Sequence, residues 1–335
     1  MTVAIRPVLG FLALLILAAA ISVGYVRVRL DAPGPLVQAR AVVIPKGIGG
    51  EGIARRLTES GVIADPTLFR LAARIVGRKD PLKAGEYEFP ARISALDAIR
   101  LVQSGRTVVR RLTIPEGLTV RQVLALLIQT EGLDGAVVRV PAEGTLLPET
   151  YHFSHGDQRQ GMVDRMGEGM REALAKTWAA RSIPPVIKTP EEALTLASIV
   201  ERETGIAAER PRVAAVFLNR LKAGMKLQSD PTVIYGLSRG EGTLGRALTR
   251  ADLESDSPFN TYARAGLPPA PIANPGRAAI MAVLNPAASD ELYFVADGSG
   301  GHVFAKTLDE HNRNVARWRK IQNERANTPA PSPPQ

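Results

Sequence analysis

An uncharged apolar run near the start of the chain constrains its structure more than any other feature. No residue from Val8 to Val26 carries a charge, and roughly 20 apolar residues suffice for a helix to cross a bilayer. We therefore expect a single transmembrane helix at residues 8–26, after a short cytoplasmic leader at 1–7. A cleaved signal peptide is the alternative, because the alanines at 18–20 could form a cleavage site, although the apolar run continues past them. Arginines on both flanks leave the orientation of the helix open.

Length and composition limit what the rest of the chain can be. The 335 residues are enough for about two domains beyond the apolar run. The absence of cysteine excludes disulfides, cysteine nucleophiles and thiolate metal sites. A net charge of +9 favours an anionic polymer or surface as partner, but the basic residues are spread out. Because no block of five Lys or Arg residues occurs, nucleic acid is not favoured.

A strand, a Pro-x-Gly turn and a helix are predicted twice, beginning at residues 42 and 112. Residues 27–40 contain turn-forming Pro and Gly and are expected to form a linker. The segment 41–110 then predicts a small α+β module with its helices against a short sheet. It resembles the LysM-like glycan-binding domain of some cell-wall enzymes; a plain packing module is the alternative.

The second part of the chain, 111–325, predicts a larger mixed α/β domain. Helical spacing occurs in several long segments, whereas Pro and Gly dominate from 257 to 276 and indicate a loop. A buried strand at 292–296 precedes a glycine-rich turn. The Pro-rich residues 326–335 are expected to be disordered. The predicted fold class is therefore α+β: an N-terminal transmembrane helix, the small module, then the larger domain.

The helix predicted at 190–203 carries the strongest chemical signal. At 3.6 residues per turn, Leu196, Ile199 and Glu203 share one side, whereas Glu201 is displaced from it. A carboxyl at the end of an apolar stripe is partly desolvated, which favours its neutral form. A neutral carboxylic acid can protonate a leaving-group oxygen, the first requirement of glycosidic cleavage. The alternative is an ordinary solvated glutamate at a helix end.

Several ordered blocks of sequence resemble one enzyme family. The main blocks are Ala197-Ser-Ile-Val-Glu-Arg-Glu203-Thr204, Val216-Phe-Leu-Asn-Arg-Leu221 and Met225-Lys-Leu-Gln-Ser-Asp-Pro-Thr-Val-Ile-Tyr-Gly236, with supporting blocks at 147–151, 260–268 and 293–304. Together they resemble the endolytic murein transglycosylase family, also called MltG or YceG-like. The likeness extends from about residue 40 to 322.

The resemblance implies a function and a location. It implies that Glu203 is the catalytic acid/base, and that peptidoglycan glycan strands are cut between N-acetylmuramic acid and N-acetylglucosamine, leaving 1,6-anhydro ends. It implies no metal and no cofactor. It also implies a single-pass protein of the inner (plasma) membrane, with its catalytic domain on the periplasmic or extracytoplasmic side. Strand-synthesising complexes would then be its neighbours.

Further polar and aromatic residues are candidates for substrate binding. A polar turn-like segment, a Pro/Gly-rich loop, scattered tyrosines and a histidine after a glycine-rich turn could contact sugar hydroxyl or acetamido groups. They are Gln228, Asp230, Thr232, Tyr235, Asn260, Tyr262, Tyr151 and His302. Each has a structural alternative: Asp230 could cap a helix, the loop residues and tyrosines could pack, and His302 could make a structural hydrogen bond.

Two other interpretations of the chain stay open at this point. A membrane-anchored binding or scaffolding protein would hold glycan without cutting it. A hydrolytic muramidase would use water and a second carboxylate, such as Glu149 or Asp230. His152 and His155 have no third ligand nearby in the sequence, so a metal site is not expected.

Overall fold

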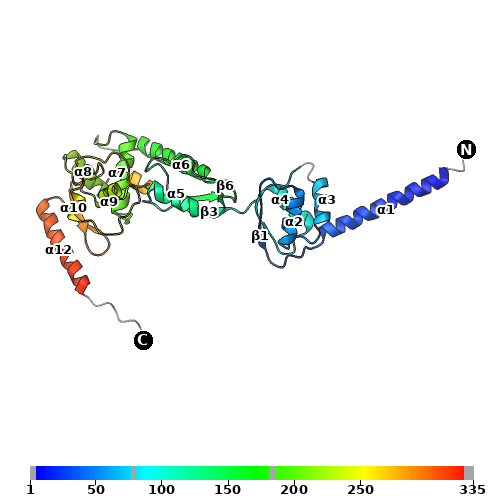
Figure 1. Cartoon of the computed structure of the whole chain (residues 1–335). Helices are drawn as coiled ribbons and strands as arrows, with labels where there is room; N and C mark the ends of the chain where they lie inside the picture. Colours follow the sequence, from blue (N-terminus) through cyan, green and yellow to red (C-terminus); the bar gives the residue numbers. More distant parts are fainter. Residues whose placement is uncertain (1–4, 77–79, 182–185, 328–335) are drawn as a thin grey trace, which may run out of the picture. The chain divides into compact units, whose positions relative to one another are not determined.

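The computed structural model describes residues 5–76, 80–181 and 186–327 (Figure 1). The N-terminal helix α1 spans Ile5–Asp31. From Leu9 to Asp31 it is long and apolar enough to cross a membrane, as a signal anchor or a signal sequence would be. Residues 1–4 of the expected leader lie outside the described residues.

Helix α1 continues further than the apolar run suggested. Residues 27–31, expected to begin a linker, are its last turns. Leu30 and Leu36 are buried in the core that follows, so packing of these side chains holds the segment in place. Pro33 and Pro35 follow the end of the helix, and neither can contribute a backbone N–H.

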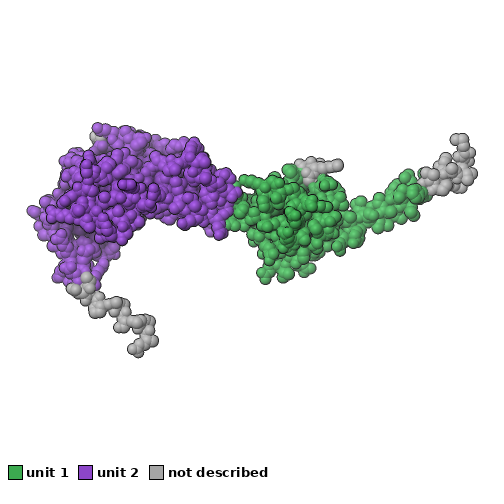
Figure 2. Space-filling view, viewed as in Figure 1, with its two compact units in different colours: residues 1–110, 152–157 green, residues 111–151, 158–335 purple. Residues whose placement is uncertain are grey.

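The chain divides into two compact units (Figure 2). Unit 1 contains residues 1–110 and 152–157, and unit 2 contains residues 111–151 and 158–335. The return of 152–157 to unit 1 was not expected from the sequence. Within unit 1, Ser154 shares a hydroxyl hydrogen bond with Thr107, and Lys46 donates to the carbonyl of Gly156 at 3.1 Å. These contacts join the returning segment to the rest of the unit.

Unit 1 is a small α+β module around one core. Its strands β1 (Arg40–Ile44) and β2 (Gly85–Phe89) pair antiparallel, with Val42 opposite Tyr87. Helices α2 (Gly50–Glu59), α3 (Pro66–Val76) and α4 (Ala95–Ser104) complete it. Fully buried Tyr87, Phe89 and Phe69 lie in its core.

The expected strand–turn–helix repeat is present. Strand β1 leads to α2 through a turn at Gly47, and β3 (Arg110–Thr113) leads to α5 (Val120–Gln129) through a turn at Gly117. The two glycines have φ values of 82° and 77°, which residues with a Cβ rarely adopt. Thr119 caps α5 with a reciprocal capping box formed with Gln122.

Unit 2 is built around the buried helix α7 (Pro190–Glu203). Pro190 occupies the first turn, and the Thr189 side chain accepts a hydrogen bond from the backbone N–H of Glu192. Helices α6 (Arg159–Ala179), α8 (Arg210–Lys222) and α11 (Arg277–Leu284) pack against α7. Their apolar side chains form one core that includes Leu196, Ile199 and Phe217.

The remaining elements of unit 2 are short, apart from the last helix. Two short helices and five strands remain. They are α9 (Asp230–Ser238), α10 (Arg250–Leu253), β4 (Leu133–Asp134), β5 (Thr150–Phe153), β6 (Asp157–Gln158), β7 (Tyr293–Ala296) and β8 (His302–Ala305). Two of these strands lie where the chain passes between unit 2 and unit 1. Strands β7 and β8 form an antiparallel hairpin, on which α12 (Leu308–Asn327) packs. Helix α12 includes residues 326 and 327, expected to be disordered, and the rest of that tail lies outside the described residues.

Candidate active site

Glu203 is the last residue of α7 and lines a pocket of about 450 Å³. The preceding residues on its side of the helix, Leu196, Ile199 and Val200, are fully buried. Glu203 therefore lies where the buried face of α7 reaches the surface. Its side chain keeps some exposure to the pocket although protein atoms surround the carboxyl closely.

The surroundings of Glu203 favour its protonated form. Burial raises the pKa of this carboxyl to about 7, and the neighbouring charge of Asp230 acts in the same direction. A hydrogen bond of 2.5 Å from the Ser229 hydroxyl opposes the shift, as do the charges of His302 and Arg220. A carboxyl with this pKa can both donate and accept a proton near neutral pH.

Ser229 is held by its own hydrogen bonds. Its backbone N–H donates to the Thr261 hydroxyl at 3.0 Å, and its carbonyl accepts from the Thr232 hydroxyl at 2.7 Å. The hydroxyls of Thr232 and Thr261 also lie 2.9 Å apart. Thr232 is fully buried and does not line the pocket, so its hydroxyl positions the backbone that carries Ser229.

Glu201, two residues earlier, has both carboxyl oxygens engaged. One accepts from Arg210 at 3.1 Å and the other accepts from the backbone N–H of Gly276 at 2.8 Å. Burial raises its pKa, and these two hydrogen bonds oppose the shift. Glu201 does not line the pocket, and its side chain is only 4% exposed. It joins α7 to α8 and to the loop before α11.

Three of the expected substrate-binding residues line the same pocket as Glu203. They are Gln228, Asp230 and Tyr262. The Tyr262 hydroxyl donates to Asp230 at 2.6 Å. The pKa of Tyr262 is raised, mainly by burial and also by the Asp230 carboxylate. Asp230 begins α9, but Ser229 is the N-cap residue. The carboxylate of Asp230 therefore faces a tyrosine hydroxyl at the pocket.

Two polar pocket residues, Arg220 and His311, were not assigned a role from the sequence. Arg220 is buried; its guanidinium donates to the carbonyls of Leu292 and Leu227, at 2.6 and 2.7 Å, and makes no ion pair with the described residues. Burial lowers its pKa. His311 stacks on Tyr293, and its buried Nδ1 has no hydrogen-bond partner among the described residues. The motif at 216–221 contains Arg220 but gives no sign that its side chain reaches Glu203.

The other expected residues lie outside this pocket. Asn260 is fully buried, and its amide nitrogen donates to the carbonyls of Leu253 and Ser255, so it braces the loop that carries Tyr262. The Tyr235 hydroxyl donates to Glu143 in a separate pocket. The Tyr151 hydroxyl donates to the carbonyl of Leu147 at 2.8 Å, and burial raises its pKa to about 12.

His302, on β8, is oriented by a carboxylate that the sequence did not indicate. Glu209 accepts from the His302 backbone N–H at 2.9 Å and lies 2.7 Å from its Nδ1. Thr204, next to Glu203, donates its hydroxyl to the same carboxylate. The His302 ring also contacts Phe294, which lines the Glu203 pocket.

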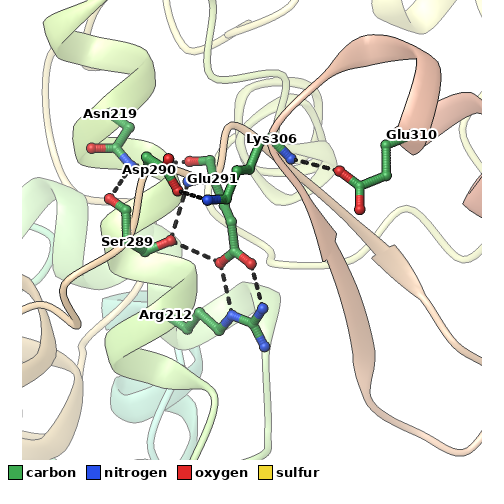
Figure 3. A network of polar contacts seen from close by, with 7 residues as sticks. All are labelled: Arg212, Asn219, Ser289, Asp290, Glu291, Lys306 and Glu310. Carbon is green, nitrogen blue, oxygen red and sulfur yellow. Dashed lines mark hydrogen bonds and ion pairs between the residues drawn. The ribbon is translucent and has the colours of Figure 1, made fainter.

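A polar network fastens the β7–β8 hairpin to α8 (Figure 3). Arg212 forms a bidentate ion pair with Glu291, with an Nε–Oε2 distance of 2.7 Å. Asn219 donates to the carbonyls of Ser289 and Glu291. Lys306 pairs with Asp290 at 2.8 Å after the hairpin. These contacts fix the start and end of the hairpin that forms one wall of the pocket.

Of the two carboxylates that a hydrolytic reaction could use, Glu149 lies outside the pocket. That side chain pairs with Arg277 at 2.6 Å and does not line the pocket. Asp230 is the other carboxylate that lines it. Among the described residues no group of three or more His, Asp or Glu side chains could hold a metal ion.

A protonatable carboxyl at the end of a buried helix, open to a polar pocket with a second carboxylate in its wall, defines a candidate acid/base site in a largely helical unit. The chain belongs to the YceG-like family, whose match covers residues 42–317. It is 30% identical to the endolytic murein transglycosylase of Bacillus subtilis strain 168, over 84% of this chain and 85% of that protein. It is 31% identical to the protein of the same name from Streptococcus pneumoniae serotype 2 strain D39.

The extent of these matches differs. The Streptococcus pneumoniae match covers 82% of this chain, which spans only 57% of that relative's length. A crystal structure of a YceG-like protein from Listeria monocytogenes is 31% identical, with a TM-score of 0.49, and the match covers 83% of this chain and 99% of that one.

Proposed function

We propose that this protein is an endolytic lytic transglycosylase that cleaves the bond between N-acetylmuramic acid and N-acetylglucosamine in peptidoglycan strands. The single observation that carries the proposal is the environment of Glu203, which is desolvated, hydrogen-bonded by Ser229 and open to a pocket. Membership of the YceG-like family and the names of the two relatives support the substrate class.

One carboxyl suffices for this reaction because the substrate supplies its own nucleophile. Neutral Glu203 donates its proton to the bridging oxygen, and the bond from that oxygen to C1 of the muramic acid breaks. The 6-hydroxyl oxygen of the same sugar bonds to C1, and its proton passes to the Glu203 carboxylate. The acid is thereby regenerated, a 1,6-anhydro end is formed, and no water is consumed. The intramolecular hydroxyl has a high effective concentration.

The pocket residues have separate roles in this proposal. Ser229 orients the Glu203 carboxyl, while Gln228 and the Asp230–Tyr262 pair contact the sugar from the pocket wall. Thr232 and Asn260 act indirectly, by holding the backbone segments that carry Ser229 and Tyr262. Arg220 supplies positive charge near Glu203, which stabilises the carboxylate present between the two proton transfers.

The remaining parts of the chain would keep the enzyme near its substrate. We propose that α1 anchors the protein in the plasma membrane and that both units lie outside the cytoplasm, next to strand-synthesising complexes. Unit 1 is the proposed LysM-like module. Its small sheet, its helices and a pocket of about 480 Å³ that includes Gly49, Glu51 and Arg70 support a glycan-binding role.

The products of digestion test the proposal. The full chain, in detergent, is incubated with uncrosslinked peptidoglycan strands, and the fragments are analysed by mass spectrometry. We expect 1,6-anhydro ends from the unmodified protein and from Glu149→Gln, an exposed carboxyl outside the pocket, and none from Glu203→Gln. Reducing ends that disappear in Asp230→Asn would indicate hydrolysis instead. If folded, unmodified protein binds the strands but releases no fragments, the chain is a binding protein and the proposal is wrong.

A further inference from the structure

A second pocket lies between the β7–β8 hairpin and α12, and no step of the proposed reaction uses it. Its volume is about 450 Å³. Polar and aromatic side chains from the hairpin, α12 and α8 line it: Asp297, His302, Asn314, Arg317, Trp318 and Arg212. Their chemistry indicates what the pocket binds.

Asn314 is the first indication of a ligand. The residue is only 6% exposed, and it lines the pocket. The amide makes no hydrogen bond with any residue that the structure describes. Its side-chain nitrogen and oxygen are not among the fully buried atoms that lack a partner, so the pocket exposes them, and they can exchange hydrogen bonds with water for hydrogen bonds with a ligand. A ligand with a hydroxyl or an amide would supply both the donor and the acceptor that Asn314 lacks.

Trp318 provides a flat face beside this amide. The turn between β7 and β8 lies against its ring, and a Cβ at Gly298 would come within 3.4 Å of ring atom Cζ3. Gly298 has a φ of 89°, which a glycine adopts without strain. The ring is half-buried. Aromatic rings of this kind offer an apolar surface to a sugar face together with an N–H donor.

The remaining polar groups are fixed in place by neighbours. Glu209 holds Nδ1 of His302 at 2.7 Å, and Nε2 makes no hydrogen bond with a described residue. The backbone N–H of Ser299 donates to Asp297 Oδ1 at 2.7 Å. An amide, an imidazole and a carboxylate beside an aromatic ring match a ligand rich in hydroxyl groups.

Helix α12 connects this pocket to the catalytic one. His311 and Val315 line the Glu203 pocket, and Asn314 and Trp318 line the second pocket. His311 and Trp318 are two helical turns apart, or roughly 10 Å along the axis, which is about the length of a disaccharide. His302, on the wall of the second pocket, contacts Phe294, on the wall of the first.

We propose that the second pocket binds an N-acetylated sugar of the glycan strand whose bond lies at Glu203, and this rests on the proposed function. Asn314 would pair with the acetamido group, and Trp318 would lie against the sugar ring. A strand that occupies both pockets extends to either side of the cleaved bond. This arrangement favours cleavage within a strand over removal of a terminal sugar.

Tryptophan fluorescence tests the proposal in the full chain, in detergent. The chain has two tryptophans, so Trp178→Phe in a Glu203→Gln background leaves Trp318 as the only one. This protein is titrated with triacetylchitotriose, an uncharged oligomer that carries no peptide. We expect a saturable change in Trp318 emission. Asn314→Ala should weaken binding about 10-fold, whereas Asn312→Ala, an exposed neighbour on α12, should leave it unchanged.

A second pair of variants guards against a failure of Asn314→Ala to fold. Arg317→Ala should weaken binding by about threefold, since Arg317 lines the pocket, and Arg319→Ala should not. No saturable change in emission, or one that neither Asn314→Ala nor Arg317→Ala weakens, would overturn the proposal. The titration needs no cleavage. Binding with this variant pattern, together with a failure to form anhydro ends, would therefore overturn only the assigned reaction.

Discussion

Two carboxyl groups at the end of α7 lie in opposite surroundings although they are two residues apart. Glu201 points between helices, where Arg210 and the backbone of Gly276 occupy both of its oxygens. Glu203 points into a pocket, where Ser229 donates a hydrogen bond to its carboxyl and no basic side chain among the described residues pairs with it. Glu201 is thus suited to holding elements together and Glu203 to exchanging a proton.

The difference follows from helix geometry combined with what each face meets. Two residues turn a helix by about 200°, so the two side chains leave α7 in nearly opposite directions. Both carboxyls are desolvated, and burial raises both pKa values. Burial alone therefore does not identify an acid catalyst. Access to the pocket, and freedom from an ion pair, distinguish the two.

The largest expected effect is on the rate of Glu203→Gln. The amide keeps the shape of the side chain and can accept from Ser229, but it cannot donate the proton that the leaving oxygen needs. We expect anhydro-product formation to fall by roughly 10³-fold. Product release from purified strands measures this, with Glu149→Gln as the control. A loss of less than tenfold would show that another group supplies the proton.

The same variant should be more stable than the unmodified protein at alkaline pH. The folded-state pKa of Glu203, about 7, is above its ordinary value of 4.5. The free energy of unfolding therefore falls as pH rises from 4.5 to 7, because in this range the folded protein binds the Glu203 proton more tightly than the unfolded chain does. Above pH 7 the full cost, roughly 3 kcal/mol, is present and Glu203→Gln should remove it. Below pH 4 the two proteins should have equal stability.

Denaturant unfolding at pH 8.5 and pH 4 measures this difference in stability. Glu149→Gln, which removes a carboxyl outside the pocket, serves as the comparison. The free energies of unfolding of the unmodified protein and Glu203→Gln could instead differ by the same amount at both pH values. That result would mean that Glu203 is not desolvated in the folded protein.

Substitution of the other carboxyl, Glu201→Gln, should instead reduce stability. It leaves the Arg210 guanidinium, only 12% exposed, without its most buried charged partner. We expect the free energy of unfolding to fall by about 1–3 kcal/mol. Activity per folded molecule should stay within a few-fold of the unmodified protein. Denaturant unfolding and active-site-normalised rates separate the two effects, and a rate loss as large as that of Glu203→Gln would contradict this division of roles.

Local patterns in the sequence predicted the part of the fold and site that depends on local geometry. The spacing of Leu196, Ile199 and Glu203 on one helix placed the carboxyl at the end of a buried face, as found. The two Pro-x-Gly turns and the apolar N-terminal helix were also predicted from patterns within short segments. The extension of α1 to Asp31 was missed, because its last turns are polar and are held by the packing of Leu30.

Contacts between distant segments could not be predicted from those patterns. Arg220 and His311 reach the pocket from α8 and α12, which are separated along the chain by three helices and a hairpin. Polarity in a Pro- and Gly-rich loop also did not show which side chains face a pocket. Tyr262 lines the pocket. The side-chain amide of Asn260, two residues earlier, instead donates hydrogen bonds to the backbone carbonyls of Leu253 and Ser255.

The smallest expected effect concerns the hydroxyl of Ser229. Its hydrogen bond lowers the pKa of Glu203 against the effect of burial, so Ser229→Ala should raise that pKa further. The neutral, proton-donating form of Glu203 would then persist to higher pH, and the alkaline decline of the rate should move upward. Ser229→Thr, which keeps a hydroxyl, should restore the original profile. Rates measured from pH 5 to 9 test this, and an unchanged alkaline limb in Ser229→Ala would show that Ser229 only supports the backbone.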